Sequence, residues 1–276
     1  MQQLSGGIRL EKKSIGLVPT MGFLHEGHLS LIEKAKSRCD FIVVSVFVNP
    51  TQFAPNEDFD KYPRDLERDK ELLIRKNVDA LFLPSENEIY GDNFQTYVEV
   101  SGISGILEGK FRPSHFKGVA TIVSILLNCV KPDAAFFGQK DAQQTAIIKK
   151  MVSDLKLDLS IEICPIVREK DGLAMSSRNS YLSADERNDA LVLYKALSSA
   201  ERMIEEGERK SKNIITEMVN IIGEVKSSAL DYIDIVETTA FELSDQLEAG
   251  KEYYILIACK IGSTRLIDNI KVKVTR

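Results

Sequence analysis

Alternation between short apolar runs and amphipathic helical segments is the feature of this sequence that most restricts its fold. Runs of apolar and β-branched residues predict buried strands at 15–19, 41–48, 80–83, 134–137 and 161–167. Apolar residues at helical spacing predict helices at 29–38, 65–77, 119–130 and 141–155. Strands that alternate with helices pair in parallel through right-handed crossovers. The sequence therefore predicts an α/β fold with a doubly wound, Rossmann-like parallel sheet.

The pattern changes near Arg168. Polar helical stretches at 184–206 and 211–225 are followed by alternating, strand-like patterns at 232–237, 253–260 and 267–274. Strands joined without intervening helices pair as antiparallel neighbours. We expect a Rossmann-like first domain, residues 1–167, and a smaller α+β C-terminal domain, residues 168–276.

Charge and cysteine usage exclude several classes of protein. The net charge of −5 gives no overall field that would attract nucleic acid. The longest apolar run, 41–48, is too short to cross a bilayer, and residues 1–13 lack the apolar stretch of a secretory signal. The four cysteines are scattered without paired spacing, as is typical of reduced thiols. We expect a cytoplasmic protein that binds neither nucleic acid nor membranes.

The segment 18–28 holds two of the three histidines of the chain, His25 and His28, on either side of Gly27. It joins a predicted strand to a predicted helix, and Gly22 permits a sharp turn between them. The first turn of a helix presents unpaired N–H groups that suit a phosphate, and Gly27 would let a nucleobase approach the backbone closely. The alternatives are a zinc pair, for which no further Cys or His stands at ligand spacing, and two surface histidines.

Three further segments carry polar groups just after predicted strands. Asn49 and Gln52 offer neutral donors and acceptors for a small hydroxylated acid, although Asn-Pro is also a common turn pair. Lys140 and Asp141 precede a helix that Asp141 and Gln144 could cap, and a cation there favours a bound anion. The segment 175–179 combines serines with Arg178, which suits phosphate oxygens or a solvated surface loop.

A fifth polar segment, 111–118, places Arg112, His115 and Lys117 just before a predicted helix, where a basic loop is the simpler interpretation. No nucleophile stands with a credible base, and the sequence contains no Gly-x-x-x-x-Gly-Lys-Ser/Thr phosphate loop. Cations, amides and helix ends stabilise charge on phosphates. These groups favour adenylyl transfer over acyl-enzyme chemistry.

Five motifs, taken together and in order, resemble the pantothenate synthetase (pantoate–β-alanine ligase) family. They are Pro-Thr-Met-Gly-x-Leu-His-x-Gly-His, Phe-Val-Asn-Pro-Thr-Gln-Phe, Arg-Pro-x-His-Phe-x-Gly-Val, Phe-Phe-Gly-x-Lys-Asp and Met-Ser-Ser-Arg-Asn. The resemblance is strong over 15–182 and looser toward the C-terminus.

The sequence departs from the pattern of the family in two places. The segment before Ile15 is short, so a strand at residues 1–8 replaces the first strand of the family or that strand is missing. Phe23 and Ala142 occupy positions where other residues are frequent.

The resemblance implies roles for individual residues. His28, Lys140 and Arg178 would be catalytic, with Lys140 and Arg178 on the phosphates of ATP. Gln52 and Gln144 would bind pantoate, and Gln52 would also bind β-alanine. The residues that would bind ATP are Met21, Gly22, Phe23, Leu24, His25, Glu26, Gly27, His28, Gly138, Gln139, Lys140, Asp141, Val167, Met175, Ser176, Ser177 and Arg178.

By the same resemblance, pantoate would react with ATP to give pantoyl adenylate and pyrophosphate, and β-alanine would then displace AMP. Mg²⁺ would accompany ATP, with no metal site built from protein ligands alone. The chain would form a homodimer, and its C-terminal domain would act as a partial lid. A nucleotidyltransferase or class I tRNA synthetase shares the His-x-Gly-His logic, but its second signature usually centres on Lys. A non-catalytic nucleotide sensor is the alternative outside the enzymes.

Overall fold

The structure, a computed structural model, describes residues 1–55 and 57–275. The chain forms two compact units. The first contains Met1–Gln139 and Gln143–Pro165, and the second contains Lys140–Ala142 and Ile166–Arg276. The short segment Lys140–Ala142 therefore belongs to the second unit, although its neighbours on both sides in the sequence belong to the first.

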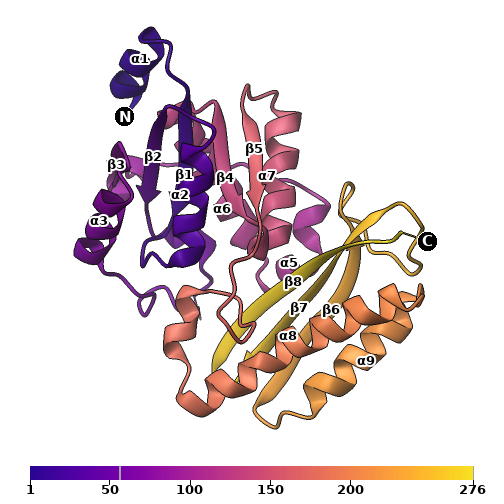
Figure 1. The fold of residues 1–276 in the computed structure, drawn as a ribbon. Helices are drawn as coiled ribbons and strands as arrows, with labels where there is room; N and C mark the ends of the chain where they lie inside the picture. The colour runs from indigo at the N-terminus through magenta and orange to yellow at the C-terminus, as the bar shows by residue number, and fades with distance from the viewer. Residues whose placement is uncertain (56, 276) are drawn as a thin grey trace. The chain divides into compact units, whose positions relative to one another are not determined.

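A five-stranded parallel sheet forms the centre of the first unit (Figure 1). Its strands lie in the order β3-β2-β1-β4-β5, and every neighbouring pair is parallel. The strands are β1 (Ile15–Thr20), β2 (Phe41–Val46), β3 (Ala80–Phe82), β4 (Ala134–Gly138) and β5 (Ser160–Cys164). The prediction of a doubly wound α/β fold is confirmed.

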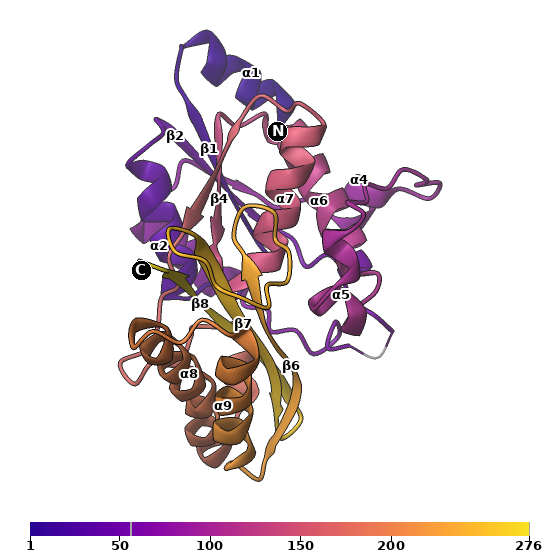
Figure 2. The ribbon, with the colours of Figure 1, turned by 90° about the vertical axis from the view of Figure 1, so that its right-hand side faces the viewer.

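Helices cover both faces of this sheet, and Figure 2 shows α2 on one side with α6 and α7 on the other. Side chains of successive strand residues point to opposite faces. On β1, Leu17 packs with α6 and α7, whereas Val18 packs with α2 and α3. The helices are α2 (Glu26–Lys36), α3 (Leu66–Arg75), α6 (His115–Val130) and α7 (Ala142–Asp154). Burial on both faces explains why the strands read as continuous apolar runs.

Short elements connect the strands and helices of the first unit. They are η1 (Pro50–Gln52), α4 (Glu86–Tyr90), η2 (Ile103–Gly105), α5 (Glu108–Phe111) and η3 (Gln139–Asp141), the last of which continues into the second unit. Ile89 and Tyr90 of α4 join the core on the α6 side of the sheet.

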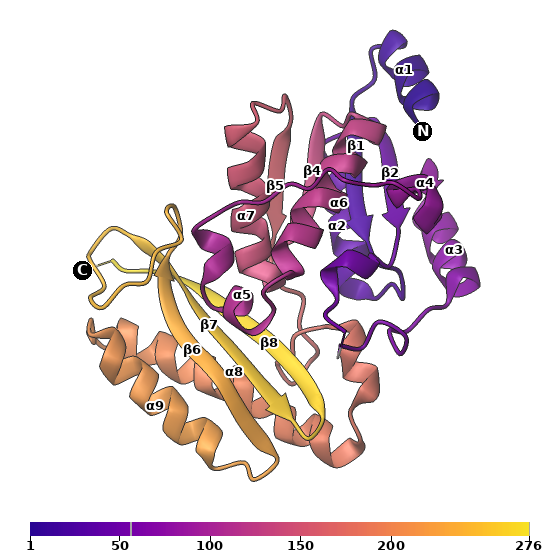
Figure 3. The ribbon, with the colours of Figure 1, turned by 180° about the vertical axis from the view of Figure 1, so that it is seen from behind.

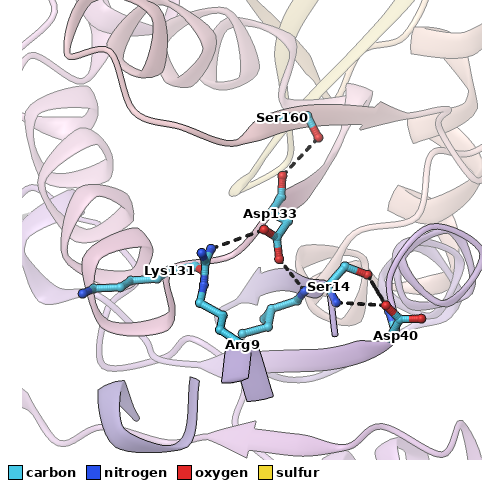
Figure 4. Close-up of polar contacts among 7 residues, drawn as sticks. Arg9, Ser14, Asp40, Lys131, Asp133 and Ser160 are labelled. Atoms are coloured by element: carbon cyan, nitrogen blue, oxygen red, sulfur yellow. Dashed lines mark hydrogen bonds and ion pairs between the residues drawn. The ribbon is translucent and has the colours of Figure 1, made fainter. Parts of the chain in front are cut away.

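Of the two expectations for the segment before Ile15, a replacement strand at residues 1–8 was wrong, because this segment forms helix α1 (Gln2–Leu10). Figure 4 shows Arg9 and Asp133 pointing toward each other, with Ser14 beside Asp40. Arg9 Nη2 donates to the carbonyl oxygen of Lys131 at 2.7 Å and lies 3.3 Å from Asp133 Oδ1. The other carboxylate oxygen of Asp133 accepts the N–H of Ile15 at 2.7 Å. These contacts attach α1 near the amino ends of β1 and β4.

The predicted strand 161–167 is shorter in the structure, where β5 ends at Cys164. Pro165 follows, and proline has no N–H to donate to a ladder. The next residues leave the sheet and turn back on themselves, with an antiparallel bridge between Arg168 and Ala174.

The second unit packs helices on a three-stranded antiparallel sheet of order β6-β7-β8 (Figure 3). Apolar residues of both long helices and all three strands, together with Leu173, form its core. This α+β organisation confirms the predicted class of the C-terminal part. Its elements are η4 (Ser177–Tyr181), α8 (Ala184–Glu205), α9 (Ser211–Gly223), β6 (Ser228–Glu237), β7 (Glu252–Ile261) and β8 (Thr264–Lys273). Among the described residues, no helix has the length and apolarity needed to cross a membrane.

Candidate active site

Three of the polar segments follow three strands that lie side by side. Residues 21–28 follow β1, residues 49–52 follow β2, and Gly138 and Gln139 end β4 and start η3. The order β2-β1-β4 makes β1 the central strand of the three, and all three are parallel. Their carboxyl ends therefore share one edge of the sheet, at the point where the strand order reverses. Open α/β sheets bind ligands at this point.

A buried carboxylate on α3 fixes the loop between β1 and α2. Asp69 is 1% exposed, and its two oxygens accept the N–H groups of Phe23 at 2.8 Å and Leu24 at 2.7 Å. Both Gly22 and Phe23 have positive φ, and a Cβ at Gly22 would lie 3.0 Å from Val46 and 3.1 Å from Asp69 Oδ2. Glycine suits this close approach, and the carboxylate holds the left-handed turn that follows it.

The two histidines of this loop lie together at the start of α2. His25 is the N-cap, and its ring centroid is 4.0 Å from that of His28. The N–H of His25 donates to His28 Nδ1 at 3.3 Å, so the neutral ring of His28 carries its proton on Nε2. The helix starts at Glu26, slightly earlier than predicted, which places Gly27 and His28 inside its first turn.

Gln52 is almost fully buried, and both ends of its side chain have partners in the first unit. Gln52 Oε1 accepts from Asn49 Nδ2 at 3.2 Å, and Gln52 Nε2 lies 2.8 Å from the sulfur of Met21. Asn49 Oδ1 accepts the hydroxyl of Tyr90 at 2.5 Å. The turn Asn49-Pro50 is therefore present, and the same asparagine holds Gln52. The second segment meets the loop after β1 through Met21.

The predicted basic loop supports the backbone of Gln52. Arg112 forms a bidentate pair with Glu57, with both N–O distances 2.7 Å. Its other terminal nitrogen donates to His115 Nε2 at 3.2 Å, so His115 Nδ1 carries the proton and donates to the carbonyl oxygen of Gln52 at 2.9 Å. Burial and the adjacent charge of Arg112 lower the pKa of His115 to about 4. Lys117 lies apart, 5.0 Å from the ring centroid of Tyr97.

Gly118 on α6 explains how this helix can touch the turn at Gln52. A Cβ at Gly118 would lie 2.5 Å from the carbonyl oxygen of Thr51 and 2.7 Å from the nitrogen of Gln52. The carbonyl oxygen of Gly118 also accepts Asn49 Nδ2 at 3.2 Å. Any larger residue at this position would displace the turn.

The two adjacent glutamines of α7 differ in their surroundings. Gln143 is 3% exposed, and its side chain makes hydrogen bonds to Glu108 N at 3.0 Å and to the carbonyl oxygens of Ile103 and Ile106, each at 2.8 Å. Gln144 is half-buried. Gln143 is therefore a structural residue, and Gln144 remains the candidate for binding. Near the same end of β4, a Cβ at Gly138 would meet no described atom within 4 Å.

Lys140 lies in the second unit, where β8 holds its backbone. Asn269 Nδ2 donates to the carbonyl oxygen of Lys140 at 2.9 Å, and Asn269 is 1% exposed. The side chain of Lys140 is 21% exposed and its ammonium lies 3.6 Å from Asp141 Oδ1. Helix α7 begins at Ala142, so Asp141 stands just before it, and capping by Asp141 stays a prediction.

A turn leads from Val167 to the segment with Arg178. The carbonyl oxygen of Val167 accepts the N–H of Met175 at 3.0 Å. At the tip, Gly172 has φ +99° and lies so close to Tyr194 that a Cβ would come within 2.0 Å of the ring. Ser176 caps η4 by accepting the N–H of Arg178 at 3.3 Å, and Ser177 is buried. The predicted loop is thus an ordered, capped turn.

The structure groups the predicted site residues within each unit. In the first unit it brings the loop Met21–His28 to Gln52, with Gly138, Gln139 and Gln144 at or following the carboxyl end of β4. In the second unit, Lys140 and Asp141 and the segment Val167–Arg178 belong to one compact body. Asp69 and Asn269 were not predicted from the sequence. Each is a polar residue within an otherwise apolar pattern, since Asp69 lies on the buried face of α3 with Leu73 and Asn269 interrupts the alternation of β8.

Known proteins resemble this chain along nearly its whole length. Residues 1–271 match the family model described as pantoate-beta-alanine ligase. A pantothenate synthetase of Caldicellulosiruptor saccharolyticus is 54% identical, covering 99% of this chain and 97% of that protein. The crystal structure of a pantothenate synthetase from Thermus thermophilus is 41% identical over 99% of this chain and 98% of that one, with a TM-score of 0.91. A pantoate-beta-alanine ligase from Francisella tularensis, complexed with beta-gamma ATP and beta-alanine, is 37% identical over 97% of this chain and 94% of that one, with a TM-score of 0.79.

Proposed function

The chain belongs to the pantoate-beta-alanine ligase family and is an enzyme of pantothenate biosynthesis, and from this premise we propose which of its residues act on each substrate. The family reaction joins the carboxyl group of pantoate to the amino group of β-alanine. The observation that carries the proposal is the convergence of three polar segments at the carboxyl ends of β2, β1 and β4. A similar enzyme in complex with beta-gamma ATP and beta-alanine supports ATP as the third substrate.

The loop Met21–His28 and the residues Gly138 and Gln139 form the ATP site of the first unit. The N-terminus of α2 supplies backbone N–H groups and a positive dipole end to phosphate oxygens. His28 donates from Nε2, because its Nδ1 accepts the N–H of His25. The open space at Gly138 suits the close approach of a ligand to the backbone.

The second unit contributes the cations. Lys140 and Arg178 bind phosphate oxygens of ATP, with Asp141, Val167 and Met175–Ser177 completing the nucleotide contacts. Arg178 offers a planar fork of donors that matches two phosphate oxygens, and Lys140 offers a compact charge. The residues 168–276 act as a partial lid on the first domain, residues 1–167.

Pantoate binds to Gln52 and Gln144, and β-alanine also contacts Gln52. Carboxamide groups both donate and accept, as a substrate with hydroxyl and carboxylate groups requires. Asn49, Met21 and His115 set the position of Gln52. Its binding geometry is therefore prepared before the substrate arrives.

The reaction runs in two displacements. A carboxylate oxygen of pantoate attacks the α-phosphorus of ATP, the bond to the bridging oxygen breaks, and pyrophosphate leaves with that electron pair. The amino nitrogen of β-alanine then attacks the acyl carbon of pantoyl adenylate, loses a proton and expels AMP. His28, Lys140 and Arg178 stabilise the negative charge that develops on the phosphates in the first step.

Mg²⁺ enters as part of the ATP substrate. Mg²⁺ is usually held by one or two carboxylates together with substrate phosphates and water, so we propose that the phosphates of ATP supply most of its ligands. We propose the homodimer and the cytoplasmic location on the ground of the family alone. Light scattering on the purified protein measures whether it is a dimer.

An assay of products tests the function. With pantoate, β-alanine and ATP all present, we expect stoichiometric AMP, pyrophosphate and pantothenate. Omission of pantoate should abolish AMP formation, because pantoate is the nucleophile of the first step. The appearance of ADP and phosphate instead would contradict the adenylate mechanism, and nucleotide binding without turnover would indicate a sensor.

A further inference from the structure

We propose that Asn269 is a positioning residue for Lys140, through the backbone of Lys140 rather than through its side chain. This inference rests on the proposed role of Lys140 in binding the phosphates of ATP. Asn269 lies on β8, far from Lys140 in the sequence, and its carboxamide nitrogen is 2.9 Å from the carbonyl oxygen of Lys140.

The hydrogen bond from Asn269 fixes the backbone of Lys140 and does not involve its side chain. Lys140 is part of a three-residue 3-10 turn, Gln139–Asp141, placed directly before α7. Such short turns have few hydrogen bonds of their own. The Asn269 bond therefore anchors this turn to the sheet of the second unit, and it uses none of the donors of the ammonium group.

Asn269 is itself held rigidly by its neighbour and by Arg168. Its N–H donates to Asp268 Oδ1 at 2.7 Å, and its carbonyl oxygen accepts Arg168 Nη2 at 3.0 Å. Arg168 also pairs with both carboxylate oxygens of Asp268, at 2.6 and 3.0 Å. Burial raises the pKa of Asp268 even though Arg168 opposes that effect. The guanidinium carbon of Arg168 lies 4.6 Å from the centre of the Tyr194 ring.

The same arginine also holds the turn that precedes the other proposed cation, Arg178. Arg168 Nη1 donates to the carbonyl oxygen of Gly172 at 3.0 Å, within the turn whose far end is Met175. The bond from Met175 N to the carbonyl oxygen of Val167 closes this turn at 3.0 Å. The segment with Arg178 follows immediately. Asn269 thus contacts the backbone of one proposed phosphate-binding cation, and through Arg168 the pair Asp268–Asn269 is linked to the turn that precedes the other.

The chemistry of the site favours a positioning role over a purely structural one. Asp268 and Asn269 are consecutive buried polar residues in β8, where no other two neighbouring residues are both buried. Buried polar groups destabilise a fold unless all their hydrogen bonds form, and apolar residues would serve the core as well. A fixed cation, by contrast, stabilises developing charge without reorganising at the moment of reaction.

A double-mutant cycle tests the inference. In the intact enzyme, Asn269→Ala and Lys140→Ala are made singly and together, and pantoate-dependent exchange of labelled pyrophosphate into ATP is measured. We expect Asn269→Ala to lower the maximal exchange rate by roughly tenfold to a hundredfold, since small displacements of a catalytic group have such effects. The KM for β-alanine in the full reaction should not change. In the Lys140→Ala background, Asn269→Ala should have little further effect.

Two controls keep the outcome interpretable. Thr264→Val removes a buried polar group at the hairpin end of β8 and should leave exchange at the wild-type rate. Asn269→Ser leaves a smaller cavity than Asn269→Ala, and its shorter side chain cannot reach the carbonyl oxygen of Lys140. The serine variant is therefore used if the alanine variant does not fold. Equal, multiplicative losses in both backgrounds would overturn the positioning role while leaving the function intact. Full exchange in Lys140→Ala would instead overturn the proposed role of Lys140 and the inference with it.

Discussion

The imidazole of His115 donates from Nδ1 to the carbonyl oxygen of Gln52 at a distance of 2.9 Å. The acceptor on the other side of the ring, Nε2, receives a bond from Arg112 at 3.2 Å. A doubly protonated ring would place a proton against the guanidinium, so this arrangement requires the neutral form of His115. The support of Gln52 is therefore linked to pH.

Protonation of His115 should destabilise the folded enzyme in mild acid. Burial and Arg112 lower its pKa from 6.5 to about 4 in the folded state. Between these values the unfolded chain binds more protons, so the free energy of unfolding falls as the pH falls through this window and is unaffected above it. The full difference corresponds to about 3 kcal/mol. Urea unfolding at a series of pH values measures it.

The variant His115→Asn isolates this contribution from the carboxylates that titrate nearby. Asparagine can retain the donor to the Gln52 carbonyl, but it does not titrate. We expect the stability advantage of the wild type over this variant to shrink as the pH is lowered from about 7 to about 4. A constant difference over that range would mean that His115 has the same pKa in the folded and unfolded states.

Asp69→Asn should loosen the loop after β1. The substitution keeps the size of the side chain but turns one acceptor toward Phe23 N or Leu24 N into a donor. Loss of one buried bond to a charged acceptor should lower the free energy of unfolding by about 1–3 kcal/mol. Because the loop is part of the proposed ATP site, the KM for ATP should rise.

The matched control is Asp65→Asn on the same helix. Asp65 accepts a single backbone N–H, from Arg68 at 3.1 Å, at the exposed start of α3. Asparagine caps helices about as well as aspartate. Chemical denaturation measures the free energy of unfolding of Asp69→Asn and Asp65→Asn, and initial-rate kinetics measure their KM for ATP. Similar effects of the two substitutions would show that the position of Asp69 is unimportant.

The adjacent glutamines of α7 should separate binding from stability. Gln144→Ala should raise the KM for pantoate and leave the free energy of unfolding unchanged, because Gln144 is proposed to contact substrate. Gln143→Ala removes three hydrogen bonds to the segment 103–108 and should destabilise the fold by about 1–3 kcal/mol or more. Thermal unfolding and pantoate titrations measure both. If Gln144→Ala loses stability but keeps normal pantoate kinetics, Gln144 has a structural role and does not bind pantoate.

The sequence was sufficient to place three of the polar segments, because each of these three follows an apolar run that forms a parallel strand. Parallel strands bring their carboxyl ends to one edge, so the convergence of Gln52 and the loop with His28 followed from the order of elements. It was also sufficient for the C-terminal sheet, where alternation distinguishes antiparallel strands from buried ones.

Contacts between distant parts of the chain account for what the sequence did not predict. Helix α1 contains Gly6 and Gly7, which disfavour a helix, and its packing together with the bonds of Arg9 stabilises it. Asp69 and Asn269 act on backbone groups that carry no sequence signal, namely the amides of Phe23 and Leu24 and the carbonyl of Lys140. A polar residue in an apolar pattern marked both positions without identifying their partners.

Removal of the His28 side chain should slow formation of the adenylate. With pantoate present and β-alanine absent, labelled pyrophosphate should exchange into ATP in the wild-type enzyme. His28→Ala deletes a donor aimed at developing charge. The activation free energy should therefore rise by about 3 kcal/mol, and the exchange rate should fall roughly a hundredfold.

The control for His28→Ala is Ser30→Ala. This variant removes a bond to the carbonyl oxygen of Gly27 on the same helix and should exchange pyrophosphate at the wild-type rate. Thermal stability should change little in either variant, because both residues are half-buried. Normal exchange in His28→Ala would reduce this histidine to a cap of α2, and exchange without pantoate would remove the assigned nucleophile.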